Sequence, residues 1–178
     1  MACNLILIRH GETVDNVARI MQGQTPGRLT PRGVEQARAL GAQLAGEHID
    51  TFVSSDLRRA VDTCVEVAAP HFGGARDKAL AAIDQTPLLR ERDWGSFTGR
   101  YIPDLKDAPW TPDIETQEAM LCRAQRFMAY LLSRYDGLTV AAVGHGIINK
   151  AIQAALYGKP MKDIPRMDNA EARRLVIR

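Results

Sequence analysis

The chain has 178 residues, of which 46% are hydrophobic, and its 23 Lys and Arg against 21 Asp and Glu give a net charge of +2. This length suffices for one well-buried core and is short for two, so we expect a single domain over residues 1–178. Charges this balanced exclude the basic footprint of a nucleic-acid-binding protein and favour a small anionic substrate held by a few local cations.

The three cysteines, Cys3, Cys64 and Cys122, follow neither metal-ligand nor disulfide spacing, and the first apolar run is only as long as a strand. We therefore expect a cytoplasmic protein without a signal peptide, a transmembrane helix or a membrane partner. The sequence does not distinguish a monomer from a homodimer.

Short apolar runs alternate with amphipathic segments in the first half of the chain. Leu5–Ile8 is predicted as a strand, and Pro31–Glu47 as a helix opened by a Thr30-Pro31 cap. Thr51–Val53 is predicted as the next strand. Ser54-Ser55-Asp56 should cap a helix that stops before Pro70, because apolar residues recur at helical spacing: Leu57, Ala60, Val61, Cys64, Val65 and Ala68. A further short strand is possible at Pro87–Leu89.

The alternation continues in the second half. Residues 99–113, rich in Pro, Asp and Trp, predict a surface excursion, and Thr116–Tyr135 a long amphipathic helix. A strand at Leu138–Val143, a helix at Ile147–Tyr157 and a terminal strand at Leu175–Ile177 follow. This order predicts an α/β fold with a mostly parallel sheet.

One pattern occurs twice: the strand from Leu5 ends in His10-Gly11, and the strand from Leu138 ends in His145-Gly146. Strand C-termini in α/β sheets open onto the crevice where ligands bind, so both imidazoles can face one pocket with Arg9. The alternatives are polar strand ends that only meet solvent and, for His145, a satisfied core histidine. Gly11, which would let the backbone approach a ligand, and the amide donor of Asn16 favour the functional interpretation.

Arg58 and Arg59 fall in the first turn of a predicted helix, where the macrodipole disfavours cations. A bound phosphate would reverse that local electrostatics; the alternative is that both arginines are simply solvated. Glu91, flanked by Arg90 and Arg92, is equally compatible with an ordinary loop charge.

Together these residues resemble the histidine phosphatase superfamily, which contains cofactor-dependent phosphoglycerate mutases and many phosphomonoesterases. The resemblance rests on segments in a family order along nearly the whole chain: Arg9-His10-Gly11-Glu12-Thr13 with Asn16, Gln22-Gly23-Gln24, Leu29-Thr30 with Gly33 and Gln36-Ala37, Ser55-Asp56-Leu57 with Arg59-Ala60 and Thr63, Leu89 with Glu91 and Gly95, and Gly144-His145-Gly146. It implies a three-layer α/β/α sandwich of the phosphoglycerate mutase-like type.

The resemblance also implies site roles. His10 would be the nucleophile, Arg9 and Arg59 the phosphate clamps, His145 the second phosphate-binding histidine and Glu91 the proton donor, with Asp93 as an alternative donor. Arg59 is selected over Arg58 because the family's arginine precedes Ala and lies four residues before Thr. The implied phosphate-binding set comprises Arg9, Asn16, Gln22, Gly23, Arg59, His145 and Gly146, with no metal and no cofactor.

A neutral nitrogen of His10 must attack phosphorus, so its other nitrogen should donate to a backbone carbonyl. The two guanidiniums, His145 and Asn16 would then meet the charge that develops on the phosphoryl oxygens.

Departures from the family pattern fall at the pocket rim. Residues 26–30 replace the usual Asp-x-Pro-Leu-Thr, Ile114-Glu115-Thr116 stands for Gly-Glu-Ser, and the mutase-type Tyr-Gly after Glu91 and the long mutase insertion are absent. We therefore expect a phosphatase of a small phosphorylated metabolite acting through a phosphohistidine. A mutase-type phosphotransferase is the alternative, and a catalytically silent binding module is disfavoured by the intact set of site residues.

Overall fold

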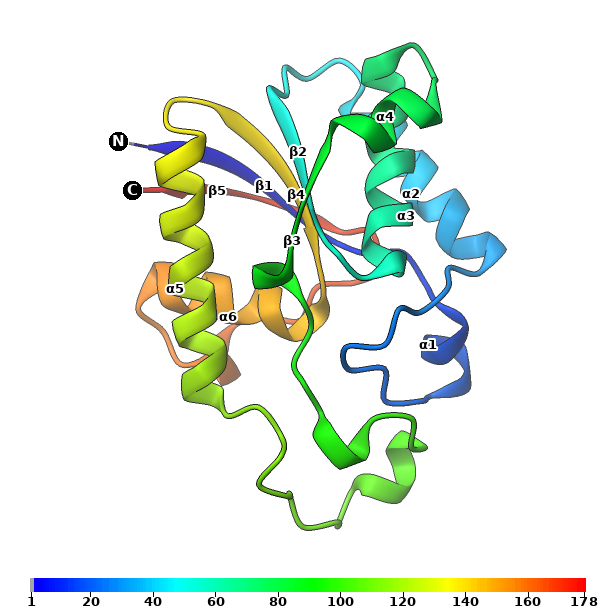
Figure 1. Ribbon diagram of the computed structural model, residues 1–178, viewed down its shortest axis with the longest axis vertical. Helices are drawn as coiled ribbons and strands as arrows, with labels where there is room; N and C mark the ends of the chain where they lie inside the picture. The colour runs from blue at the N-terminus through cyan, green and yellow to red at the C-terminus, as the bar shows by residue number, and fades with distance from the viewer. Residues whose placement is uncertain (1) are drawn as a thin grey trace.

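The computed structural model describes residues 2–178, and its strands and helices alternate along the chain (Figure 1). The strands are β1 (Cys3–Arg9), β2 (Thr51–Ser55), β3 (Ile83–Thr86), β4 (Thr139–Gly144) and β5 (Ala172–Ile177). The α-helices are α1 (Val14–Ala18), α2 (Pro31–Leu44), α3 (Arg58–Ala68), α4 (Arg76–Ala82), α5 (Gln117–Arg134) and α6 (Gly146–Tyr157). Among these residues no helix is both long and apolar enough to cross a bilayer.

The strands form one sheet in the order β3-β2-β4-β1-β5, in which only β5 runs antiparallel to its neighbour. Helices α5 and α6 cover one face of the sheet, and α2, α3 and α4 lie on the other (Figure 1). This confirms the three-layer α/β/α architecture with a mostly parallel sheet.

Strand β1 shows why the sheet is buried on both faces. Leu5 and Leu7 pack into the core beneath α5 and α6, while Ile6 and Ile8 pack into the core beneath α2 and α3. Successive side chains of a strand point to opposite faces, so a strand covered on both sides is apolar throughout. The continuous apolar run from Leu5 to Ile8, from which the strand was predicted, is explained by this burial on both faces.

Two local predictions were wrong. The expected strand at Pro87–Leu89 is a 3-10 turn, and β3 lies just before it, where a single large apolar residue, Ile83, marks an edge strand. Helix α3 begins with Leu57 as an N-cap that makes no side-chain cap hydrogen bond. Asp56 pairs with Arg90 instead, at 2.7 and 2.6 Å.

Helices α1 and α4 were not predicted. Both are short, and α1 buries none of its residues, so its sequence has no apolar repeat from which a helix could be predicted. A capping box marks its start, because Thr13 accepts from the Asn16 N–H while Asn16 accepts from the Thr13 N–H, both at 3.0 Å.

The excursion after Glu91 has a small core of its own, formed by Phe97, Leu105 and Ile114. Arg92 contacts two indole rings that meet edge-to-face, 4.8 Å from the centre of Trp94 and 4.5 Å from that of Trp110. Cation–π contacts of this kind bind an otherwise irregular segment together. The excursion lies beyond the end of the sheet that is opposite the chain termini (Figure 1).

Candidate active site

The two histidines that follow β1 and β4 lie side by side. The strands are neighbours with Arg9 opposite Gly144, so His10 and His145 leave the sheet at the same level. Their ring centroids are 5.2 Å apart in an edge-to-face arrangement, and both rings are almost fully buried. The repeated strand-His-Gly pattern thus places both imidazoles at one crevice, as expected.

His10 is held in a single tautomer. Its Nδ1 lies 2.7 Å from the carbonyl oxygen of Gly11, which only accepts, so Nδ1 carries the proton and Nε2 keeps a free lone pair. Burial, and then the charge of Arg59, lower the pKa of His10 well below its usual value. The imidazole is therefore neutral at physiological pH, as a nucleophile requires.

His145 packs edge-to-face against His10 and does not itself line the pocket. Its Nε2 is 2.9 Å from Ser55 Oγ, and its buried Nδ1 has no partner among residues 2–178. Ser55 Oγ also accepts the Leu57 N–H at 3.3 Å, and its own O–H can donate to Nε2. His145 would then carry its own proton on Nδ1. Burial, followed by the charge of Arg59, lowers the pKa of His145 well below its usual value.

Arg9 and Arg59 bring two buried guanidiniums to the same place. Arg9 is 7% exposed and Arg59 1% exposed, and neither is in an ion pair within the described part of the chain. Arg9 donates to the Met167 carbonyl at 2.7 Å, yet the Nε atoms of both arginines are buried without a hydrogen bond. Buried cations without an anion are costly, so this cluster is built to receive one.

The structure also separates Arg58 from Arg59. Arg58 is exposed and pairs with Asp62 one turn along α3, at 3.3 Å, which is the solvated alternative considered from the sequence. Arg59 points inward and donates to the carbonyls of Gly23, at 2.8 Å, and Thr25. Burial lowers the pKa of Arg59 to about 10, so it stays charged at neutral pH.

By these hydrogen bonds Arg59 holds residues 22–25 in place, and part of this segment forms one wall of the pocket. Gly23 lies on the pocket wall with φ +53°, a backbone conformation that favours glycine. Gln22 and Asn16 lie on the same wall. Asn16 Oδ1 accepts from the Thr13 N–H, which leaves its amide nitrogen as a donor for a ligand.

These residues surround a pocket of about 330 Å³, a volume suited to a small metabolite. Its lining comprises Arg9, His10, Asn16, Ile20, Met21, Gln22, Gly23, Arg59, Glu91, Trp94, Ile102, Gly146, Ile147, Lys150 and Arg166. Every residue predicted for the site is therefore on the wall except His145, which contacts His10. Their catalytic roles stay predictions.

Gly11 does not serve the purpose expected of it. A Cβ on Gly11 would lie 2.4 Å from the carbonyl oxygen of Gly33, so glycine is required by the close approach of the α2 backbone rather than by a ligand. The Gly11 N–H donates to Thr63 Oγ1 at 3.0 Å, and that hydroxyl donates to the Arg59 carbonyl at 2.8 Å. Thr63 thus ties the segment of His10 to the helix of Arg59.

Glu91 lies at the N-terminus of α6. Its carboxylate accepts the N–H groups of Ile147 at 3.0 Å, Ile148 at 3.1 Å and Arg92 at 2.9 Å. Asp93, the alternative proton donor, is exposed, accepts the Gly95 N–H at 2.9 Å and is absent from the pocket wall. The geometry favours Glu91.

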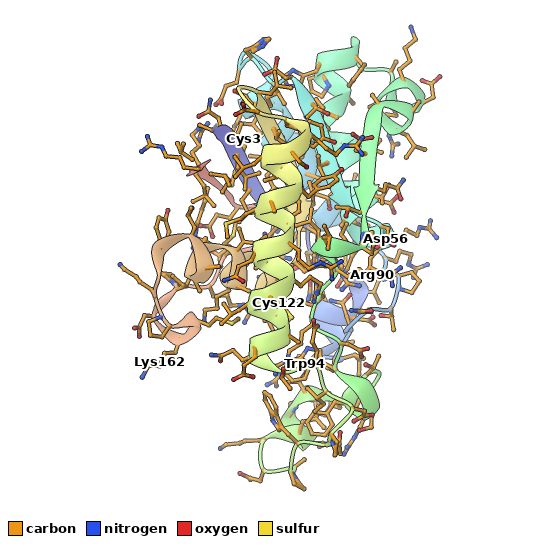
Figure 2. The ribbon with its side chains drawn as sticks, turned by 60° about the vertical axis from the view of Figure 1, so that its left-hand side comes forward. Cys3, Asp56, Arg90, Trp94, Cys122 and Lys162 are labelled. Carbon is orange, nitrogen blue, oxygen red and sulfur yellow. The ribbon has the colours of Figure 1, made fainter. Side chains whose placement is uncertain are left out.

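The segment that carries Glu91 is held from two sides. The paired side chains of Asp56 and Arg90 hold it against the start of α3, as Figure 2 shows. On the other side Arg123 of α5 donates to the carbonyls of Leu88, at 3.1 Å, and Glu91, at 3.3 Å. Arg123 also pairs with Glu115 at 2.8 Å.

Sequence reasoning missed three cations that matter here. Arg123 is one of several polar residues on α5, and nothing in its spacing singles it out. Lys150 lies four residues after Gly146 and thus on the same helix face, a signal that was available. Arg166 comes from an irregular segment before β5, where the sequence gives no indication of a site.

Comparisons with known proteins agree with this geometry. The sequence profile described as histidine phosphatase superfamily (branch 1) matches residues 5–178. A metal-independent phosphoserine phosphatase of Arabidopsis thaliana is 38% identical over 87% of this chain and 71% of its own. A probable phosphoglycerate mutase of Enterobacter sp. is 30% identical over 86% and 74%. The solved structure of mycobacterial glucosyl-3-phosphoglycerate phosphatase in complex with VO3 is 28% identical, covers 96% of this chain and 91% of its own, and superposes with a TM-score of 0.82.

Proposed function

The chain belongs to the histidine phosphatase superfamily, and on that premise we propose that it hydrolyses phosphate monoesters of small metabolites by transferring the phosphoryl group to His10. One observation carries the proposal: two buried guanidiniums without a carboxylate partner converge on a pocket that also holds a neutral imidazole with its Nε2 free. This combines a cradle for phosphate with a nucleophile for phosphorus.

The reaction would run in two steps. His10 Nε2 bonds to phosphorus as the ester P–O bond breaks, and Glu91 gives a proton to the departing alkoxide. Water then attacks phosphorus, Glu91 takes up its proton, and the P–N bond breaks to release phosphate. Arg9, Arg59, the Asn16 amide and the Nδ1–H of His145 stabilise the charge on the phosphoryl oxygens in both steps.

The Glu91 carboxylate meets an incoming anion in this scheme. Glu91 must carry a proton when the ester binds, lose it to the leaving oxygen and regain one from the attacking water. The residue lies against the N-terminus of α6, whose N–H groups fix the carboxylate in place for both proton transfers.

Hydrolysis is preferred over mutase-type transfer because the excursion after Glu91 is short, which leaves the phosphohistidine open to water. The likeness to a probable phosphoglycerate mutase keeps phosphotransfer as the second candidate. Mass spectrometry of the products formed from 3-phosphoglycerate separates the two, since a phosphatase yields glycerate and phosphate whereas a mutase yields the isomeric phosphoglycerate.

The decisive experiment is the change His10→Ala. Turnover of p-nitrophenyl phosphate should vanish, and an acid-labile, base-stable phosphate label should form on the unchanged protein alone. His48→Ala is the matched control, because His48 is exposed and lies outside the pocket. Undiminished turnover by folded His10→Ala protein would refute the assignment.

The cytoplasm is the compartment we propose. Cys3, Cys64 and Cys122 are all unpaired, with Cys122 exposed on α5, which suits a reducing environment. A small phosphorylated compound is the proposed partner, and neither nucleic acid nor a membrane is expected to bind.

A further inference from the structure

Lys150 and Arg166 are two cations on the pocket wall that the proposed phosphoryl transfer does not use. Neither is in an ion pair within the part of the chain that the structure describes. Unlike Arg9 and Arg59 they are only partly buried or exposed, so they lie toward the mouth of the pocket.

The charges on the wall exceed what one phosphate needs. Arg9, Arg59, Lys150 and Arg166 face a single wall carboxylate, that of Glu91. Asp168 and Glu171 also act on Arg9 and Asp15 acts on Arg59, all three from outside the wall, and Glu171 is paired with Arg173 at 2.8 Å. Lys150 and Arg166 are therefore the wall cations that remain for a further anion once the phosphate is bound by Arg9 and Arg59.

The backbone positions of Lys150 and Arg166 are close in the chain to residues that contact Arg9. Lys150 lies one turn along α6 from Gly146, the residue beside Arg9 and Glu91. Arg166 directly precedes Met167, whose carbonyl accepts from Arg9, and the Arg166 carbonyl itself accepts from Arg173 at 3.1 Å. After burial, the charge of Arg166 is the next cause that lowers the pKa of Arg9, so the two guanidiniums are close.

Another part of the wall is apolar. Ile20, Met21, Trp94 and Ile102 line the pocket without offering a charge. A substrate would therefore place its carbon skeleton against these side chains and direct any second charge toward α6 and the segment before β5 (Figure 1).

We propose that Lys150 and Arg166 form a subsite for a second anionic group of the substrate, so that the enzyme prefers phosphate monoesters that also carry a carboxylate or a second phosphate. This inference rests on the proposed function and adds the substrate class to it. Two cations on separate elements can bind either group, and the experiment distinguishes the two.

Matched pairs of esters test the subsite. 3-Phosphoglycerate against glycerol 3-phosphate isolates a carboxylate, and fructose 1,6-bisphosphate against fructose 1-phosphate isolates a second phosphate. Dissociation constants are measured by calorimetry on His10→Ala protein, which holds esters without turning them over, and kcat/KM on protein with His10 intact. We expect the doubly anionic member of at least one pair to bind about tenfold more tightly.

Lys150→Met and Arg166→Met should each bring the preference for the doubly anionic ester toward one, chiefly through KM. Because the preference is a ratio between two esters on the same variant, a general loss of activity cancels out of it. Lys159→Met and Arg126→Met are the controls, since both residues are exposed and off the pocket wall, and they should leave the ratio unchanged. A ratio near one for both pairs, or a ratio that survives both pocket substitutions, would overturn the subsite. Failure to hydrolyse any ester would refute the proposed function instead, because the binding ratio is measured independently of turnover.

Discussion

Replacing Glu91 by Gln removes an ionisable group while keeping the shape of the side chain. Oε1 accepts from the N–H groups of Arg92, Ile147 and Ile148, whereas Oε2 accepts only from Ile147, at 3.0 Å. A glutamine that keeps its oxygen at the Oε1 position therefore preserves three hydrogen bonds and loses one. It also loses the negative charge at the N-terminus of α6.

We expect Glu91→Gln to lower the stability of the protein only slightly but to lower its rate on alkyl phosphates strongly. One shared hydrogen bond contributes about 1 kcal/mol and the helix-terminus charge about 0.5 kcal/mol more, so we expect Tm to fall by roughly 3–6 °C. Loss of a general acid slows a reaction by about a hundredfold or more when the leaving oxygen is basic. The rate on alkyl phosphates should therefore fall by about that factor, while p-nitrophenyl phosphate, whose phenolate leaves without a proton, should slow by less than about threefold.

The assay is the ratio of kcat values on an alkyl phosphate and on p-nitrophenyl phosphate. Asp93→Asn is the matched control, because Asp93 is two residues away, exposed and off the pocket wall, and it should spare both rates. An equal loss on both substrates for Glu91→Gln would make Glu91 a positioning residue. A selective loss for Asp93→Asn would transfer the acid role to Asp93.

Four further predictions follow from the site. Turnover should be insensitive to EDTA, since cationic side chains supply the charge that a metal would provide, and a requirement for added Mg²⁺ would contradict this. Orthovanadate should inhibit competitively well below substrate concentrations, because its trigonal-bipyramidal adduct resembles the transferring phosphoryl group; weak or non-competitive inhibition would count against in-line transfer to His10. Burial and Arg59 lower the pKa values of His10 and His145 below the usual histidine value of about 6.5, so the unfolded chain binds more protons in acid. The free energy of unfolding, from urea titrations, should then fall below about pH 6.5 by up to ~1.4 kcal/mol per pH unit for each histidine, less steeply in His145→Gln, and an identical slope in that variant would refute the linkage. Arg123→Met should cost about 3 kcal/mol of stability, because it removes the ion-pair partner of Glu115 and leaves the Leu88 and Arg90 carbonyls without their donor, and a urea midpoint that does not move would show that this network is dispensable.

Periodicity in the sequence was enough to predict the α/β class of this fold. The alternation of apolar runs with amphipathic helices predicts a mostly parallel sheet, the family resemblance implies the three layers, and the structure has that arrangement. Where burial is slight the pattern fails. Helix α1 buries no residue and β3 contains one large apolar residue, so neither carries a period, and the strand expected at Pro87–Leu89 is a turn.

The sequence also determined the chemical components of the site, because strand ends and helix starts are local features. His10 and His145 follow predicted strands, and Arg59 breaks a helix-dipole preference that a phosphate would satisfy. The family resemblance had already selected Arg59 over Arg58, and the structure agrees. Tertiary structure alone decided that Gly11 accommodates the Gly33 backbone and that Lys150 and Arg166 share a wall with Arg9. These outcomes depend on contacts between residues far apart in the chain, and such contacts leave no periodic trace in either segment taken separately.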